Sequence, residues 1–238
     1  MFDDAIEFGD HMENGTENHL EPVQDPLKPL DQVMESDPRF QGSALAMQQK
    51  HAELNQIQLL ECVPLDVRQL FETAKNVSLY SWFVYRFHQV AELVAYTALE
   101  RALKERIAHD QGVNADSIRG RFSRLLTTAA QNGWFKSANF TATKCLAQRQ
   151  LEHEQLIRMI QESRFGDEPV EVPGIPEDRI NDRAAQLNFV EILSTGIPQL
   201  RNHLAHGGPL LHPDSASTLR TVAEAINQLF EALGAAAS

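Results

Sequence analysis

An arginine, an asparagine and two histidines lie close together in the stretch PQLRNHLAHGGP, residues 198–209. These residue types suit the cleavage of RNA without a metal ion. Near neutral pH, a histidine can take or give the proton that moves when a 2′-hydroxyl attacks its own phosphate. An arginine binds phosphate oxygens through two parallel hydrogen bonds, which a lysine cannot reproduce. The candidate catalytic residues are therefore Arg201 and His206, with Asn202 able to orient the histidine or hold a phosphate oxygen.

Two other interpretations of the same stretch stay open. Basic side chains in the last turn of a helix offset the negative end of its dipole, and Gly207 can end such a helix as its C-cap. A zinc ion could instead bind His203, His206 and His212. The chain has no HExxH pattern, and we expect the site to need neither a metal ion nor an organic cofactor.

Residues outside the motif could hold the RNA backbone. The densest basic cluster is RGRFSR, which contains Arg119, Arg121 and Arg124. Such a cluster can neutralise phosphates, and we expect His203 to contribute beside the motif. The alternative is an ordinary solvated helix face, because exposed arginines are common. Glu92 and Glu100 belong to a long helical segment, and Glu92 could orient Arg201 across the helices.

The elements that must position these residues are all predicted to be helices. Apolar residues recur every three or four positions, and no convincing run alternates as a strand would. The strongest pattern covers residues 77–108 and predicts the spine of the domain, or half of a dimer seam. Gly196 and Pro198 predict an interruption before a short helix that carries the motif. The sequence therefore predicts an all-α bundle of five to six helices.

The remaining helices follow from the same spacing. A helix is expected to begin at Asp116 or Ser117 and to stop at Asn132, and the last helix is expected over residues 215–233. Another is predicted over residues 142–163. Its inward positions are expected to be Leu146, Leu156, Ile157 and Ile160.

The order of these features resembles the HEPN superfamily. Its signature is R-x4-6-H with a polar residue after the arginine, and RNHLAH at 201–206 fits it at the end of a short helix that one amphipathic helix follows. The resemblance covers about residues 60–235. It implies a HEPN-like bundle that forms a homodimer and cleaves RNA at the dimer interface, as toxins and antiviral defence proteins do. It equally allows a non-catalytic binding or dimerisation module.

One departure from the family concerns silencing by a partner. Some HEPN toxins carry a tyrosine two residues after the histidine, where a partner transferase attaches a nucleotide. Gly208 stands at that position here. The resemblance therefore leaves an antitoxin or another protein partner possible, without this mode of control.

The charge of the chain is concentrated at its start. Residues 1–40 hold eleven acidic and two basic residues, which accounts for −9 of the net charge of −12. This composition and several prolines predict a disordered acidic tail over residues 1–42 and an all-α domain over 43–238. Phe2, Ile6 and Phe8 could dock on a partner. So acidic a chain is not a general nucleic-acid coat, and any contact with RNA must be local.

Targeting signals and cysteine frameworks are not evident in the sequence. The acidic start differs from a secretory signal, and no apolar run is long enough to cross a membrane. Cys62 and Cys145 are far apart, without a CxxC pattern. We therefore expect a cytoplasmic location.

Overall fold

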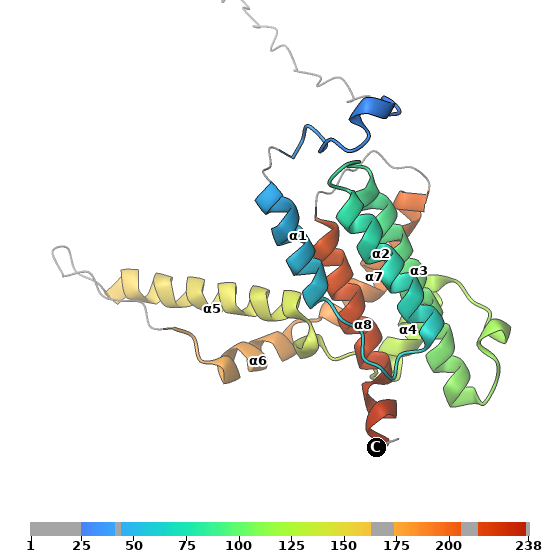
Figure 1. The fold of residues 1–238 in the computed structure, drawn as a ribbon. Helices are drawn as coiled ribbons and strands as arrows, with labels where there is room; N and C mark the ends of the chain where they lie inside the picture. Colours follow the sequence, from blue (N-terminus) through green and yellow to red (C-terminus); the bar gives the residue numbers. More distant parts are fainter. Residues whose placement is uncertain (1–24, 41–43, 163–173, 206–213, 237–238) are drawn as a thin grey trace, which may run out of the picture. The chain divides into compact units, whose positions relative to one another are not determined.

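The computed structural model describes residues 25–40, 44–162, 174–205 and 214–236, and in these residues it contains helices and no strand. The predicted all-α class is confirmed, but the described residues form eight α-helices rather than five or six (Figure 1). The α-helices are α1 Ala44–Gln56, α2 Leu65–Tyr80, α3 Phe87–Gln111, α4 Phe122–Gln131, α5 Thr141–Glu162, α6 Glu177–Gln186, α7 Phe189–Ala205 and α8 Ser215–Ala236. Three short 3-10 helices are η1 Leu30–Gln32, η2 Ala115–Ser117 and η3 Ser137–Asn139.

The chain divides into two compact units, residues 1–34 and 35–238. In the first unit, η1 carries Leu30 with its side chain exposed. The second unit holds all eight α-helices. None of the helices in the described ranges is long and apolar enough to span a lipid bilayer.

The core of the second unit forms around α3, as predicted for a spine. Small residues along α3 are completely buried, namely Ala91, Ala95, Ala98 and Ala102. They allow α2 and α8 to pack closely on it, and Figure 1 shows these three helices side by side. The last helix, predicted over residues 215–233, is confirmed as α8, and it buries Leu219, Val222, Ile226 and Leu229 in this core. Periodicity located α8 correctly because this helix buries one continuous face.

The predicted helix over residues 77–108 is in fact the end of α2, a turn and most of α3. The turn at 81–86 is stabilised by a residue far away in the sequence. The backbone N–H of Asp37 donates to the carbonyl of Trp82 at 2.8 Å, and the Asp37 carboxylate accepts from the N–H of Tyr85 at 3.2 Å. The uninterrupted helical spacing of 77–108 does not show this partner, so the break could not be predicted.

Residues 35–40 belong to the compact unit that holds the helices. Asp37 is 6% exposed, and the ring of Phe40 stacks on Trp82 with centroids 5.2 Å apart. Arg39 lies over the ring of Tyr85 at 4.6 Å. The acidic composition of the tail continues into this segment, but its aromatic and carboxylate contacts place it in the fold.

A buried polar cluster links the same turn to the start of α8. His88 is 2% exposed, and its Nδ1 lies 2.7 Å from Oγ of Ser215 and accepts the N–H of Ser215 at 3.4 Å. Its Nε2 lies 3.0 Å from Oγ of Ser81. Ser78 completes the cluster at 2.7 Å from Ser215. This cluster holds the first residue of α8 against the end of α2 and the start of α3.

The motif-bearing helix is longer than predicted. Gly196 and Pro198 do not interrupt it, and α7 runs without a break from Phe189 to Ala205. A proline inside a helix removes one hydrogen bond, but Leu193 and Ile197 on the same helix are buried and their packing offsets that loss. The chain instead breaks at residues 187–188, which separate α6 from α7.

The prediction for the helix over 142–163 was right for its span and wrong for its inward face. The buried residues of α5 are Thr143, Ala147 and Leu151, which lie on the side that packs against α6 and η3. The four apolar residues predicted to point inward are exposed, namely Leu146, Leu156, Ile157 and Ile160. Their spacing indicates one apolar face, but spacing alone does not show what covers it.

We expect deletion of residues 1–34 to leave the melting temperature within about two degrees of that of the full chain, because the helical unit begins at residue 35. Deletion through residue 40 should lower it clearly. Asp37→Ala should cost about 2 kcal/mol of unfolding free energy, since the N–H of Tyr85 loses its acceptor. Thermal unfolding followed by circular dichroism measures all three. Equal melting temperatures for the two deletions would contradict the assigned boundary.

Candidate functional site

Arg201 emerges from α7 at the edge of the core. Ile197 and Pro198 are buried, and Arg201 follows Ile197 by one turn on the same side of the helix. α7 packs against α3 and α4, so this side faces α3. The Arg201 side chain is 37% exposed, which leaves the guanidinium accessible from solvent.

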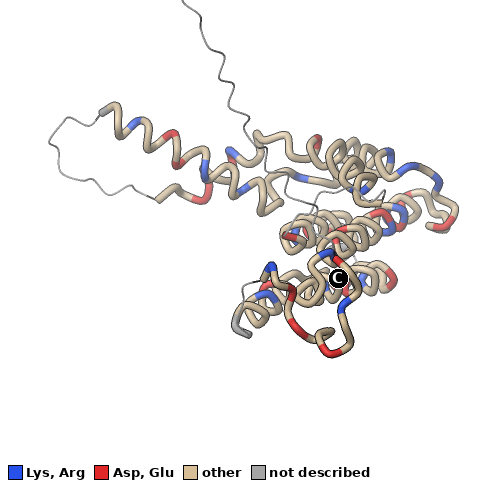
Figure 2. Tube along the Cα trace, turned by 90° about the horizontal axis from the view of Figure 1, so that it is seen from above, with Lys and Arg blue, Asp and Glu red and all other residues tan. Residues whose placement is uncertain are grey.

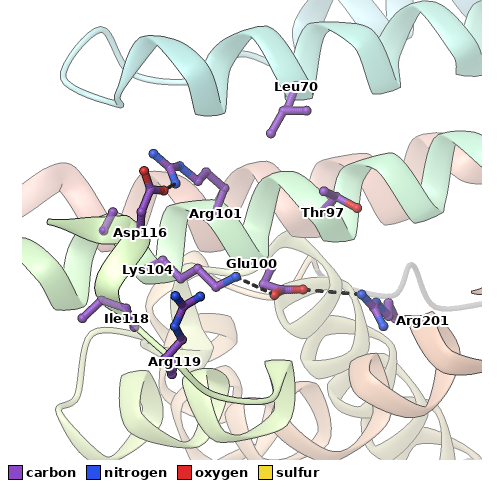
Figure 3. Close-up of a pocket in the computed structure, with 10 residues that line it drawn as sticks. Leu70, Thr97, Glu100, Arg101, Lys104, Asp116, Ile118, Arg119 and Arg201 are labelled. Carbon is purple, nitrogen blue, oxygen red and sulfur yellow. Dashed lines mark hydrogen bonds and ion pairs between the residues drawn. The ribbon is translucent and has the colours of Figure 1, made fainter.

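The carboxylate beside Arg201 belongs to Glu100 of α3. One guanidinium nitrogen of Arg201 lies 3.6 Å from Oε2 of Glu100, and Nζ of Lys104 lies 2.9 Å from Oε1. Figure 3 shows the two cations reaching Glu100 from opposite sides. A phosphate that enters between them would compete with Glu100 for both cations.

Glu92 was one candidate to orient Arg201, the alternative being a position on the outer face of the helix, but it is buried and has another partner. It is 5% exposed and accepts a hydrogen bond from Oγ1 of Thr218 on α8 at 2.8 Å. Burial raises the pKa of the neighbouring Tyr96 to about 12, and the charge of Glu92 adds to that effect. Glu100 lies eight residues after Glu92, at the part of α3 that α7 faces.

Two adjoining pockets share Arg201 and Glu100. The first has a volume of about 610 Å³ and is lined further by Lys104 and Arg119. The second has a volume of about 420 Å³ and is lined further by Arg121 and Asn202, together with other residues of α4 and α7. The ion pair between Arg201 and Glu100 therefore forms a wall that both pockets share.

The second pocket lies at the N-terminal end of α4. Gly120, Arg121, Phe122 and Ser123 line it, and no side chain caps this helix. The first N–H groups of an α-helix have no partner within the helix, and with the helix dipole they favour an anion. An anion in this pocket would therefore meet backbone N–H groups and two guanidinium groups.

The basic cluster reaches these pockets because α4 starts later than predicted. The expected start was Asp116 or Ser117, but α4 begins at Phe122 and Arg121 is extended, with φ −72° and ψ 149°. The side chain of Asn114 accepts a hydrogen bond from the backbone N–H of Asp116, so it caps the 3-10 helix η2 and not α4. Within this segment Arg119 lines the first pocket and Arg121 the second.

A set of ion pairs that the sequence did not predict holds this segment in place. Arg101 donates to Asp66 of α2 at 2.6 Å and to Asp116 of η2 at 2.6 Å, and it also pairs with Glu105 one turn later. The hydrogen bond with Asp116 is the largest cause that raises the pKa of Arg101. The i,i+4 spacing of Arg101 and Glu105 was visible in the sequence, whereas the contacts with Asp66 and Asp116 depend on the fold.

Some predicted residues do not reach the pockets. Arg124 on α4 and His203 on α7 are exposed and line neither of them. His206 and His212 lie outside the described residues, so acid–base catalysis by His206 and zinc binding by the histidines stay predictions. Within the described ranges there is no group of three or more histidine, cysteine, aspartate or glutamate side chains that could hold a metal ion.

The chain was also compared with models of known protein families, with curated proteins and with solved structures, and none of them matches. The function must therefore be argued from the residues around Arg201 and from the motif that contains it.

We expect Arg101→Gln to loosen the segment that carries Arg119 and Arg121. The pairs of Arg101 are partly exposed, so the unfolding free energy should fall by less than about 1 kcal/mol. Hydrogen–deuterium exchange of residues 115–121 should become faster. Arg183→Gln is the matched control, since Arg183 has the same 29% side-chain exposure and pairs with Glu154 elsewhere. Equal exchange in both variants would show that Arg101 does not position the segment.

Proposed function

We propose that this chain is a metal-independent endoribonuclease of the HEPN type, acting in a toxin or antiviral defence setting. The observation that carries the proposal is the second pocket. Arg201 and Asn202 of the RNHLAH motif line it together with Arg121 and the uncapped start of α4. Two of the three residues predicted for catalysis thus share a pocket with a residue predicted for RNA binding.

This pocket suits the phosphate at which RNA is cut. Arg201 can bind two of its oxygens, and the N–H groups at the start of α4 can bind another. Lys104 and Arg119 in the adjoining pocket can bind a neighbouring phosphate of the same strand. Both pockets are local basic features of an acidic chain, which agrees with the expectation of a local RNA contact.

The proposed reaction needs two proton transfers. The 2′-oxygen attacks the phosphorus while its proton moves to a base, and the 5′-oxygen leaves with a proton from an acid. The products are a 2′,3′-cyclic phosphate and a free 5′-hydroxyl. His206 follows the last residue of α7 in the sequence and supplies one of the two groups. A second copy of the chain would supply the other, as the resemblance to HEPN proteins implies.

Glu100 is proposed to hold Arg201 and Lys104 in place until RNA arrives. It accepts a hydrogen bond from Lys104 and pairs with Arg201, so it holds both cations in place while the pockets are empty. The negative charge of Glu100 also repels phosphate. Glu100 therefore weakens the binding of RNA while it keeps Arg201 oriented. We therefore treat Glu100 as a positioning residue.

We expect His206→Ala to abolish cleavage and Arg201→Lys to reduce it by roughly 100-fold or more, because lysine keeps the charge and loses the paired hydrogen bonds. The assay is purified protein on mixed cellular RNA with excess EDTA, with product ends analysed for 2′,3′-cyclic phosphate. His51→Ala is the control, since His51 is an exposed histidine on α1 that lines neither pocket, and this variant should keep full activity.

Three results would contradict the mechanism: cleavage that stops in EDTA, cleavage that persists in His206→Ala, or a loss of activity in His51→Ala equal to that in His206→Ala. RNA binding without cleavage would identify a non-catalytic HEPN-like binding module instead.

We expect Glu100→Gln to bind RNA more tightly and to cleave it more slowly. Removing one negative charge beside Arg201 and Lys104 should lower the dissociation constant by about fivefold at low salt and by less at high salt. Cleavage should slow because Arg201 is no longer oriented. Fluorescence anisotropy with labelled RNA and single-turnover kinetics separate the two effects. Glu105→Gln is the control, because Glu105 lies on α3 outside both pockets and pairs with Arg101. Weaker binding by Glu100→Gln would contradict the role assigned to Glu100.

A further inference from the structure

Arginine side chains from two helices line a pocket that is separate from the two pockets around Arg201. α5 and α6 lie side by side (Figure 1), and the pocket that they form with residues 174–176 has a volume of about 320 Å³. Arg158 of α5 and Arg179 of α6 both line it, and neither of them lines a pocket that contains Arg201. We refer to it as the α5–α6 pocket.

The acidic residue of this pocket already has a partner. Both carboxylate oxygens of Glu154 accept hydrogen bonds from Arg183, at 2.8 and 3.1 Å. The hydrogen bond from Arg183 is the main cause that holds the pKa of Glu154 below its ordinary value. The charges of Arg179 and Arg158 lower that pKa further. Both arginines of the pocket therefore lie near Glu154, but Arg183 occupies its carboxylate.

The two arginines of the pocket keep their charge for a ligand. Arg158 and Arg179 are exposed, and in the part of the chain that the structure describes neither forms an ion pair. Because Arg183 neutralises Glu154, two positive charges remain at the pocket.

This positive charge comes from side chains and not from the start of α6. The first turn of α6 carries Glu177 and Asp178, which offset the positive end of the helix dipole and do not line the pocket. An anion in the pocket would meet two guanidinium groups that come from different helices. Guanidinium groups bind phosphate oxygens through paired hydrogen bonds.

The rest of the lining indicates that the ligand has a less polar part beside its phosphate. Leu151, Ile175 and Pro176 supply apolar surface. A volume of about 320 Å³ lies at the lower end of the range for small-molecule sites, about 300–1,000 Å³, and suits one nucleotide unit rather than a bare ion. We propose that the α5–α6 pocket binds the phosphate of a nucleotide unit, with Arg158 and Arg179 holding its oxygens.

RNA is the expected source of this nucleotide unit. The chain carries a net charge of −12, and Figure 2 shows its basic residues scattered among acidic ones, so it attracts RNA only through local basic sites. A strand whose cut phosphate lies at Arg201 would gain a second contact at the α5–α6 pocket. This source rests on the proposed function. Phosphate binding itself does not, because the pocket shares no residue with the pockets around Arg201.

The first test measures the binding of adenosine monophosphate to the full chain by isothermal titration calorimetry. An Arg201→Gln background removes the guanidinium group that the two other pockets share. In this background, Arg158→Gln/Arg179→Gln should weaken the binding of the nucleotide by at least about fivefold, because both guanidinium groups are lost. Lys144→Gln/Arg149→Gln is the matched control, since it removes the same charge from α5 outside the pocket and should leave binding unchanged.

A short glutamate peptide is the comparison ligand, because it offers carboxylates and no phosphate. Helical circular dichroism and an unchanged melting temperature show that each variant is folded. Three results would overturn the proposal: no binding of adenosine monophosphate, equal binding by the pocket variant and the control, or binding of the peptide as tight as that of the nucleotide.

The second test distinguishes RNA from a free nucleotide as the source, by fluorescence anisotropy with a labelled single-stranded RNA at several salt concentrations. Each phosphate contact contributes about 0.7 to the slope of log affinity against log salt, so Arg158→Gln/Arg179→Gln should reduce that slope by about 1.4. The rate of cleavage at saturating RNA should stay unchanged, because the pocket is separate from the cut phosphate.

The outcomes of the two tests separate this proposal from the proposed function. RNA binding that Arg158→Gln/Arg179→Gln leaves unchanged, with nucleotide binding lost, would identify a free nucleotide as the ligand of the pocket. RNA that binds through the pocket and is not cut by the wild type would contradict the proposed function and support the phosphate site.

Discussion

The structure depends on close packing along the alanine-rich side of α3. Ala91, Ala95, Ala98 and Ala102 have no exposed surface, so α2 and α8 approach the backbone of α3. Because α3 is covered there, its charged residues emerge only along the remaining strip, where Thr97, Glu100, Arg101 and Lys104 all line the first pocket. The polar strip of the central helix thus becomes the wall of the candidate site. Larger side chains at the alanine positions would separate the helices and move that wall.

Charge balance decides what this site can do. Arg201, Lys104 and Arg119 line one pocket, and Glu100 pairs with two of these cations, which offsets part of their positive charge. Glu100 must release these cations when a phosphate binds. The contacts that orient the cations in the empty site therefore weaken the binding of phosphate. Arg101 does not compete for Glu100, because it pairs with Asp66, Glu105 and Asp116. These pairs hold η2 against α2 and α3.

The helices differ in what their apolar residues are used for. In α8, a stripe of regular spacing is buried completely, and in α5 a stripe of similar spacing remains exposed. α7 shows a third case, in which buried Leu193 and Ile197 maintain a helix across Pro198. Local preference and apolar spacing therefore indicate that a face exists. The elements that pack against a face determine whether it stabilises the fold or remains exposed.

The sequence by itself determined the helical class, the central position of α3, the buried stripe of α8 and the motif around Arg201, because each is a local pattern of spacing and residue type. Only the tertiary structure decided that Asp37 contacts the turn that divides the long helical segment, that Glu100 rather than Glu92 pairs with Arg201, and that Leu146, Leu156, Ile157 and Ile160 of α5 are exposed. It also brought Arg119 and Arg121, about eighty residues from Arg201 in sequence, to the same two pockets. Each of these depends on contacts between residues far apart in the chain, and such contacts have no signature in local periodicity.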